Sequence, residues 1–139
     1  MSNRAVLMSI KPKYADLIFA GIKTVELRRV CPKVGPGDLV IVYVSSPRMA
    51  LVGGFEVAGI VSEEPKMLCR EWQPQSGVEK ETFLYYFRDC ATAYGILIGR
   101  TWQFESASGL EALRRRKGGF HPPQSYRYLG SEEFLKLMH

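Results

Sequence analysis

Three charged residues lie close together near the N-terminus: Lys23, Glu26 and Arg28. In an extended strand, side chains two positions apart share a face and lie about 6.6 Å apart along it. Glu26 and Arg28 can therefore form an ion pair or converge on one ligand. Lysine and arginine neutralise phosphate, and a carboxylate accepts a hydrogen bond from an exocyclic amine such as that of cytosine. The alternative is an exposed strand face whose ion pair contributes about 0–1 kcal/mol to stability.

The elements around these residues are predicted from apolar spacing and turn residues. Pro12 suits the first turn of a helix, and Gly21 suits the left-handed residue that ends it. The alternation over residues 24–30 predicts a half-buried strand. Lys11 and Lys23 flank the helix and begin about 18 Å apart, so they need not share a pocket.

The rest of the chain predicts a domain that mixes helices and strands. Further strands are expected at residues 5–10, 39–44, 49–61 and 92–105, with 39–44 central, a bulge at Gly53-Gly54 and a bend at Gly95 and Gly99. Further helices are expected at residues 65–72, 79–90, 108–117 and 132–138, the third opened by a capping box from Ser108 to Glu111. The fold class is therefore α+β, a small mixed β-barrel with helices packed around it.

Length and composition indicate a single domain spanning residues 1–139. The chain is 46% hydrophobic and 24% charged, as in ordinary globular domains. Apolar runs such as residues 39–44 are far shorter than the roughly 20 residues that cross a bilayer. Residues 1–4 lead directly into a strand without a signal peptide. We expect a cytoplasmic protein that does not bind membranes.

The motifs of several function classes are missing from the sequence. Cys31, Cys69 and Cys90 form no closely spaced pair, and the two histidines are His121 and His139. A zinc site therefore lacks ligands, and we expect free thiols, no metal and no cofactor. There is also no phosphate-binding glycine-rich loop, no dinucleotide-binding glycine motif and no nucleophile-elbow serine, which argues against kinases, dinucleotide enzymes and ordinary hydrolases.

The net charge of +5 is distributed unevenly. Residues 1–46 and 91–139 are basic, whereas residues 47–90 carry five basic and seven acidic side chains. This pattern favours one positive face that attracts a polyanion.

Two segments near the C-terminus have two interpretations each. Residues 114–117 are either phosphate contacts or a solvated helix end whose cations complement the helix dipole. Phe120, Tyr126 and Tyr128 beside Arg127 are either a base-stacking platform or a clamp of the terminal segment on the core.

Four segments together resemble a known family. Gly21-x-Lys23-x-x-Glu26-x-Arg28, preceded by Ser9-Ile-Lys-Pro12, resembles the signature of the ASCH domain, a member of the PUA-like superfamily. Residues 43–47 and 122–129 are similar to the matching segments of the family's bacterial and archaeal single-domain proteins. The resemblance covers most of the chain and is weakest at residues 64–90.

The resemblance implies a PUA-like β-barrel with a cleft beside the first helix, in which such domains are thought to bind RNA, a base or a nucleotide. The ligand-binding residues that it implies, together with a serine from the later segment, are Lys11, Lys23, Glu26, Arg28, Ser45, Ser46 and Ser125. We therefore expect a nucleic-acid-binding ASCH domain whose partner is RNA, single-stranded nucleic acid or a nucleotide-like ligand.

Other functions stay open at this point. The resemblance also suggests an amidohydrolase, because some relatives in the superfamily are thought to act on acetylated cytidine with a threonine nucleophile at the position of Glu26. In this chain the threonine, Thr24, lies two positions earlier, so Glu26 would act as a base on water. Metal-independent RNA cleavage is a second hydrolase reaction, with Lys23, Tyr43 and Ser125 as candidates. Lys23 and Glu26 are the candidate catalytic residues overall. A regulatory module that binds protein partners is a further alternative.

Overall fold

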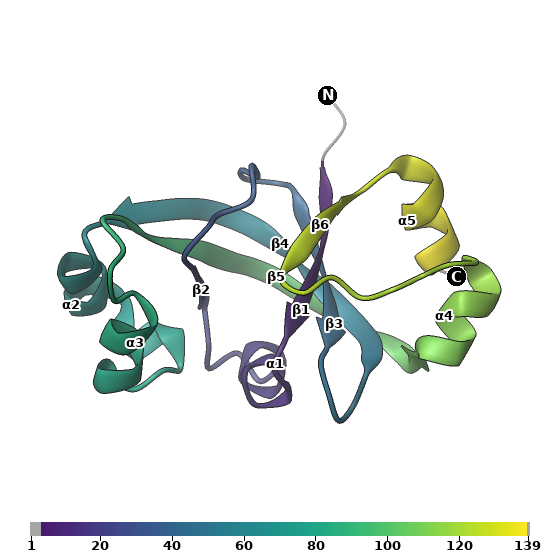
Figure 1. Cartoon of the computed structure of the whole chain (residues 1–139), viewed down its shortest axis with the longest axis horizontal. Helices are drawn as coiled ribbons and strands as arrows, with labels where there is room; N and C mark the ends of the chain where they lie inside the picture. The colour runs from purple at the N-terminus through teal and green to yellow at the C-terminus, as the bar shows by residue number, and fades with distance from the viewer. Residues whose placement is uncertain (1–3, 139) are drawn as a thin grey trace.

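The computed structural model describes residues 4–138. Residues 1–3 and His139 lie outside this range. The predictions about the start of the chain and about His139 as a metal ligand therefore concern residues that the structure does not describe. The described residues form a curled sheet with helices at its two ends and one helix along its side (Figure 1).

The strands and helices alternate irregularly along the chain. The strands are β1 (Ala5–Ile10), β2 (Val25–Arg28), β3 (Leu39–Val44), β4 (Ala50–Glu63), β5 (Ala93–Gly109) and β6 (Tyr126–Leu129). The helices are α1 (Pro12–Phe19), α2 (Pro65–Ser76), α3 (Lys80–Tyr86), α4 (Leu110–Arg116) and α5 (Ser131–Leu137).

All six described strands belong to one sheet, in the order β2-β5-β4-β3-β1-β6. β1 pairs with β3 in parallel, and the remaining pairs are antiparallel. The sheet curls into a half-barrel, so the predicted α+β class is confirmed. In Figure 1, α2 and α3 lie at one end of the long β4–β5 ribbon, whereas α4 and α5 lie at the opposite end.

The core divides into three clusters because the central strands are apolar on both faces. One set of alternating side chains from β1 and β3 packs with Ala15 and Ile18 of α1. The other set, which includes Tyr43, packs with Leu113 of α4 and Leu137 of α5. The third cluster joins Leu27 of β2 to side chains of α2 and α3. The prediction of a central strand at residues 39–44 is therefore confirmed.

Close packing explains the glycines of the two long strands. A Cβ on Gly53 would lie 2.2 Å from the carbonyl oxygen of Trp102, and the strand register shifts at this position, as predicted. A Cβ on Gly95 would lie 2.7 Å from a methyl group of Val25. Gly95 therefore allows β2 to lie close against β5, which fixes the strand that carries Glu26 and Arg28.

The structure corrects several predicted elements. β6 was not predicted, because a strand of four residues shortly after a proline pair carries little periodic signal. The capping box is wrong: Gly109 occupies the N-cap position, and Ser108 Oγ instead accepts a hydrogen bond from Arg116 at 2.8 Å. α2 continues to Ser76, beyond the predicted end, and Gly77 terminates it with φ of 69°.

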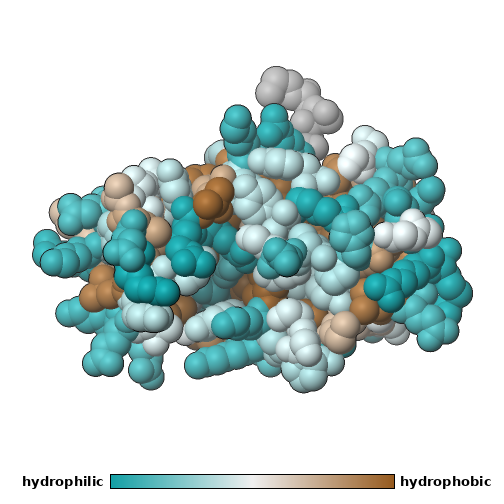
Figure 2. All heavy atoms as spheres, viewed as in Figure 1, coloured by the Kyte–Doolittle hydropathy of each residue, from teal (hydrophilic) through white to brown (hydrophobic). Residues whose placement is uncertain are grey.

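Polar side chains cover most of the face shown in Figure 2, and hydrophobic side chains appear there as separate patches. Within residues 4–138, no helix is both long enough and apolar enough to traverse a membrane.

Candidate functional site

Lys23, Glu26 and Arg28 form a connected charge cluster. The Glu26 carboxylate lies between the two cations, with Oε2 accepting a hydrogen bond from Arg28 Nη2 at 2.9 Å and Oε1 lying 3.5 Å from Lys23 Nζ. The spacing along β2 therefore brings Glu26 and Arg28 together, as predicted from the sequence. Two cations share one carboxylate, so the cluster carries a net positive charge.

Arg28 also connects the two edges of the sheet. β2 is at one end of the strand order and β6 at the other. Arg28 Nη1 donates to Ser125 Oγ at 3.0 Å, directly before β6, and Nη2 donates to the carbonyl oxygen of Ser9 in β1 at 3.2 Å. Ser9 Oγ in turn donates to the carbonyl oxygen of Pro123 at 2.6 Å. One guanidinium group thus joins three segments that are far apart in sequence.

Lys23 is held by the C-terminal end of α2. Its Nζ donates to the carbonyl oxygen of Ser76 at 2.5 Å and lies 5.1 Å from the centre of the Tyr14 ring. Gly77 lies next to it, and a Cβ there would be 3.4 Å from Lys23 Cβ. The helical pair α2–α3 therefore supplies one wall around the lysine, and α1 supplies another.

The charged cluster is almost fully buried. Lys23 is 2% exposed, Glu26 7% and Arg28 9%. The exposed ion pair considered as the alternative is therefore wrong, and so is the half-buried strand: every residue of β2 is buried, because α2 packs against the strand. Alternation alone could not show that a helical insert covers the polar face.

Burial lowers the pKa of Lys23, although the neighbouring Glu26 carboxylate opposes this shift; Arg28 adds to the lowering. The folded protein therefore disfavours the charged lysine; this cost is full below the lowered pKa and disappears as the pH rises from that pKa to the ordinary lysine value. A side chain kept in place at a cost to stability is typical of a functional site.

The cluster opens into a pocket of about 240 Å³. Its walls come from the end of β1, from α1, from β2 and from α3, with the lining residues Ser9, Ile10, Lys11, Tyr14, Lys23, Glu26, Leu27, Arg28, Val78, Thr82 and Tyr86. Lys11 is exposed, which places its charge at the mouth of the pocket.

Lys11 and Lys23 therefore line the same pocket, although their positions in the sequence left this open. The chain folds back after α1, so that the backbone N–H of Lys23 donates to the carbonyl oxygen of Leu17, in the last turn of the helix, at 3.0 Å. Helix rise alone overestimates the separation because it ignores this reversal and the length of the lysine side chains.

The remaining candidates do not line the pocket. Ser45 and Ser46 follow β3; the backbone N–H of Ser45 donates to the carbonyl oxygen of Ile10 at 2.9 Å, and Ser46 is exposed. Tyr43 is buried in the second core cluster, 6.3 Å from Phe120 between ring centres, and burial raises its pKa. Ser125 contacts two pocket residues, because its Oγ accepts a hydrogen bond from Arg28 and its carbonyl oxygen accepts one from the backbone N–H of Ser9 at 3.0 Å. Thr24 is exposed and also does not line the pocket.

The basic cluster of α4 is largely occupied within the protein. Arg114 donates to the carbonyl oxygen of Phe120, Arg115 pairs with Glu111, and Arg116 donates to Ser108. The structure therefore favours the interpretation as a helix end.

The aromatic residues near the C-terminus behave as a clamp. Phe120 is buried in the core, and Arg127 forms a two-point ion pair with Glu133 at 2.6 and 2.8 Å, which holds α5 to β6. Tyr128 is exposed but accepts a hydrogen bond from the backbone N–H of Lys33 at 2.9 Å.

Sequence reasoning missed the aromatic walls of the pocket. Tyr14 and Tyr86 both line the pocket, but neither was among the candidate site residues. Arg29 lies over the Tyr86 ring at 5.0 Å. No local pattern could have revealed them, because they come from helices about 70 residues apart in sequence.

No group of three or more metal-ligating side chains is found among residues 4–138. Cys31, Cys69 and Cys90 are free thiols.

Comparison with known proteins decides the family. The model of the ASCH domain matches residues 8–117. The chain belongs to the ASCH domain family. The ASCH domain-containing ribonuclease of Zymomonas mobilis is 27% identical over 136 residues, which is 98% of this chain and 91% of that protein.

Solved structures show the same ASCH architecture. The crystal structure of ASCH from Zymomonas mobilis has a TM-score of 0.90 and 25% identity, with 96% of this chain and 93% of that chain covered. The N-terminal domain of Staphylothermus marinus McrB shares the fold alone, with a TM-score of 0.60, 10% identity and coverage of 99% and 97%.

Glu26→Gln tests the charge cluster directly. The substitution leaves two buried cations without a carboxylate between them, so we expect a loss of about 2–4 kcal/mol in the free energy of unfolding at neutral pH. Lys23→Met in the same chain should recover part of this loss, because it removes one of the two cations. Urea denaturation of the single and double variants measures both effects.

Glu111→Gln is the matched control, because its partner Arg115 is exposed, and it should change stability little. A Glu26→Gln protein as stable as the native one, or a double variant no more stable than Glu26→Gln alone, would contradict this account.

Proposed function

We propose that the pocket binds single-stranded RNA by taking up one unpaired base. The observation that carries this proposal is the combination of buried donors, one buried acceptor and aromatic walls in a single small cavity. Lys23 and Arg28 offer N–H donors to ring nitrogens and carbonyl oxygens, and Glu26 offers an acceptor to an exocyclic amine. Nucleobases carry both kinds of group on their edges.

The dimensions of the pocket support a base rather than a larger ligand. Its volume of about 240 Å³ is below the roughly 300–1,000 Å³ of sites for small molecules. The tyrosine rings of Tyr14 and Tyr86 line it, and aromatic rings are the usual stacking partners of unpaired bases. A base inside a duplex could not enter, so the ligand is a single strand.

Charge at the mouth supports a nucleic acid rather than a free base. Lys11 is exposed at the edge of the pocket, and Arg29 is exposed beside Tyr86. Cations in these positions can contact the phosphates on either side of an inserted base. The name of the Zymomonas mobilis relative, a ribonuclease, makes RNA the strand that we favour.

Two substitutions separate base recognition from phosphate contact. Lys23→Met removes a donor inside the pocket and should weaken binding about tenfold or more at every salt concentration. Lys11→Gln removes one phosphate contact and should make the salt dependence shallower by about 0.7 in the log–log slope. Fluorescence anisotropy with a labelled single-stranded RNA measures both effects, with Lys136→Gln on α5 as the charge-matched control for Lys11→Gln.

The pH dependence gives an independent readout. Because the pKa of Lys23 is lowered, RNA affinity should fall at a pH below the ordinary lysine range, and Lys23→Met should abolish this fall. If Lys23→Met binds RNA as the native chain does at all pH values, the pocket is not the RNA site. Equal affinity for a duplex of the same sequence would also overturn the proposal.

RNA cleavage is the second candidate function, favoured by the named activity of the relative and by the lowered pKa of Lys23. In this reaction Glu26 accepts the proton of a ribose 2′-hydroxyl, the 2′-oxygen bonds to phosphorus, and the bond to the 5′-oxygen breaks. Lys23 donates a proton to that oxygen. The products are a 2′,3′-cyclic phosphate and a 5′-hydroxyl end, and no metal takes part.

Mass spectrometry of RNA incubated with excess protein and a chelator tests this candidate. Cleavage predicts the cyclic phosphate end, a loss of about 100-fold in rate for Lys23→Met, and an intact strand when the 2′-hydroxyl is replaced by hydrogen. Intact RNA in the presence of the native chain restricts the function to binding. Equal cleavage by Lys23→Met would assign the activity elsewhere.

A further inference from the structure

A second groove, of about 420 Å³, lies between α2 and α3. Its polar lining comes from Lys66, Arg70 and Gln73 of α2 and from Lys80 of α3. The three residues of α2 are spaced by four and three positions, which places them along one face of the helix. We call this the α2–α3 groove, in contrast to the pocket of Lys23, Glu26 and Arg28.

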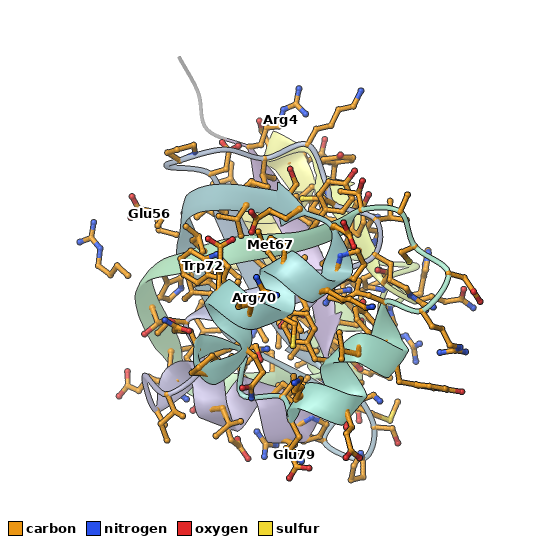
Figure 3. The ribbon with its side chains drawn as sticks, turned by 90° about the vertical axis from the view of Figure 1, so that its left-hand side faces the viewer. Arg4, Glu56, Met67, Arg70, Trp72 and Glu79 are labelled. Atoms are coloured by element: carbon orange, nitrogen blue, oxygen red, sulfur yellow. The ribbon has the colours of Figure 1, made fainter. Side chains whose placement is uncertain are left out.

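The cations of the groove have no carboxylate partner within residues 4–138. No ion pair joins Lys66, Arg70 or Lys80 to an acid in this part of the chain. The acid Glu71 of α2 instead shares a hydrogen bond with Glu63, which raises the pKa of Glu63. Figure 3 looks onto this end of the molecule and shows Glu79 at the lower edge of the face, away from Arg70. Lys66, Arg70 and Lys80 therefore face solvent without a carboxylate at ion-pair distance among residues 4–138, although the segment also carries acidic side chains.

The groove and the pocket share a wall. Lys80 and Leu84 of α3 line the groove, whereas Thr82 and Tyr86 line the pocket. Successive residues of a helix are rotated by about 100°, so these two pairs lie on opposite sides of α3.

The turn between α2 and α3 connects the two sites as well. Gln73, which lines the groove, donates from Nε2 to the carbonyl oxygen of Val78, which lines the pocket, at 2.8 Å. Ser76 lies between them; its hydroxyl donates to the carbonyl oxygen of Gln73 at 2.7 Å, and its own carbonyl oxygen holds Lys23. A ligand that crosses the start of α3 would pass from one site to the other.

We propose that the α2–α3 groove binds backbone phosphates of the same RNA strand whose base occupies the pocket. This inference rests on the proposed function and adds a second contact region to it. Within residues 4–138, the three cations have no carboxylate partner, so they can pair with phosphates. Proteins that bind single strands combine such a charged track with sites that hold individual bases. An acidic protein segment would be attracted by the same charge but would gain nothing from the adjoining base pocket, so we favour RNA.

The test compares short and long RNAs in two charge-matched variants. Arg70→Gln/Lys80→Gln removes two cations of the groove. Arg115→Gln/Lys136→Gln removes one arginine and one lysine at the opposite end of the molecule, on α4 and α5 (Figure 1). Affinities for a dinucleotide and for a single-stranded RNA of roughly twelve nucleotides are measured by fluorescence anisotropy over a range of salt concentrations.

We expect the groove variant to bind the dinucleotide as the native chain does. It should bind the longer RNA about tenfold more weakly, with a log–log salt slope shallower by ~1.4, and the control variant should match the native chain at both lengths. Equal affinity of the groove variant and the native chain for the longer RNA would overturn the inference while leaving the pocket in place. Equal losses in both variants would show general attraction only and would overturn it too.

The pocket variant Lys23→Met separates the two proposals. A loss of binding at both RNA lengths supports the pocket, whatever the result for the groove. If Lys23→Met binds both RNAs normally, the proposed function fails, and the inference about the groove fails with it. Capture of an acidic peptide by the groove, without any effect of its cations on RNA binding, would replace RNA as the partner.

Discussion

The Arg28 guanidinium is the contact on which the site depends. The sheet is open, with β2 and β6 at opposite ends of its hydrogen-bond order, so no backbone ladder closes it. Arg28 bridges this opening by contacting Glu26 on its own strand, the end of β1, and Ser125 just before β6. A seam that is closed by side chains rather than by strands leaves room for a polar cavity. In a closed barrel, β2 and β6 would pair through backbone hydrogen bonds; here the pocket lies beside the opening between them.

The helical insert gives this opening its chemical character. α2 ends against Lys23 and accepts its hydrogen bond, and α3 contributes Tyr86 to the wall. The same insert carries the cations of the α2–α3 groove on its other side. The sequence resembles the ASCH family least in this insert, whereas the signature residues Lys23, Glu26 and Arg28 lie on and directly before β2.

The sequence was sufficient for the central strands and for the charge cluster itself. Residues 39–44 are apolar on both faces, which only a central position in a sheet satisfies, and the shorter apolar run at residues 5–10 predicts the strand beside it. It was insufficient for the burial of Glu26 and Arg28, for the shared pocket of Lys11 and Lys23, and for the tyrosine walls. Each of these depends on contacts between distant segments, above all on α2–α3 packing over β2. Local periodicity determines which face a side chain takes, but not what covers that face.

The central claim is that an unpaired base enters the cavity beside Arg28. A crystal structure of the chain with a short single-stranded RNA tests it most directly. The account predicts one base lying between Tyr14 and Tyr86, with its polar edge towards Glu26 and its flanking phosphates near Lys11 and Arg29. An RNA bound elsewhere on the surface, with the cavity filled only by solvent, would contradict it.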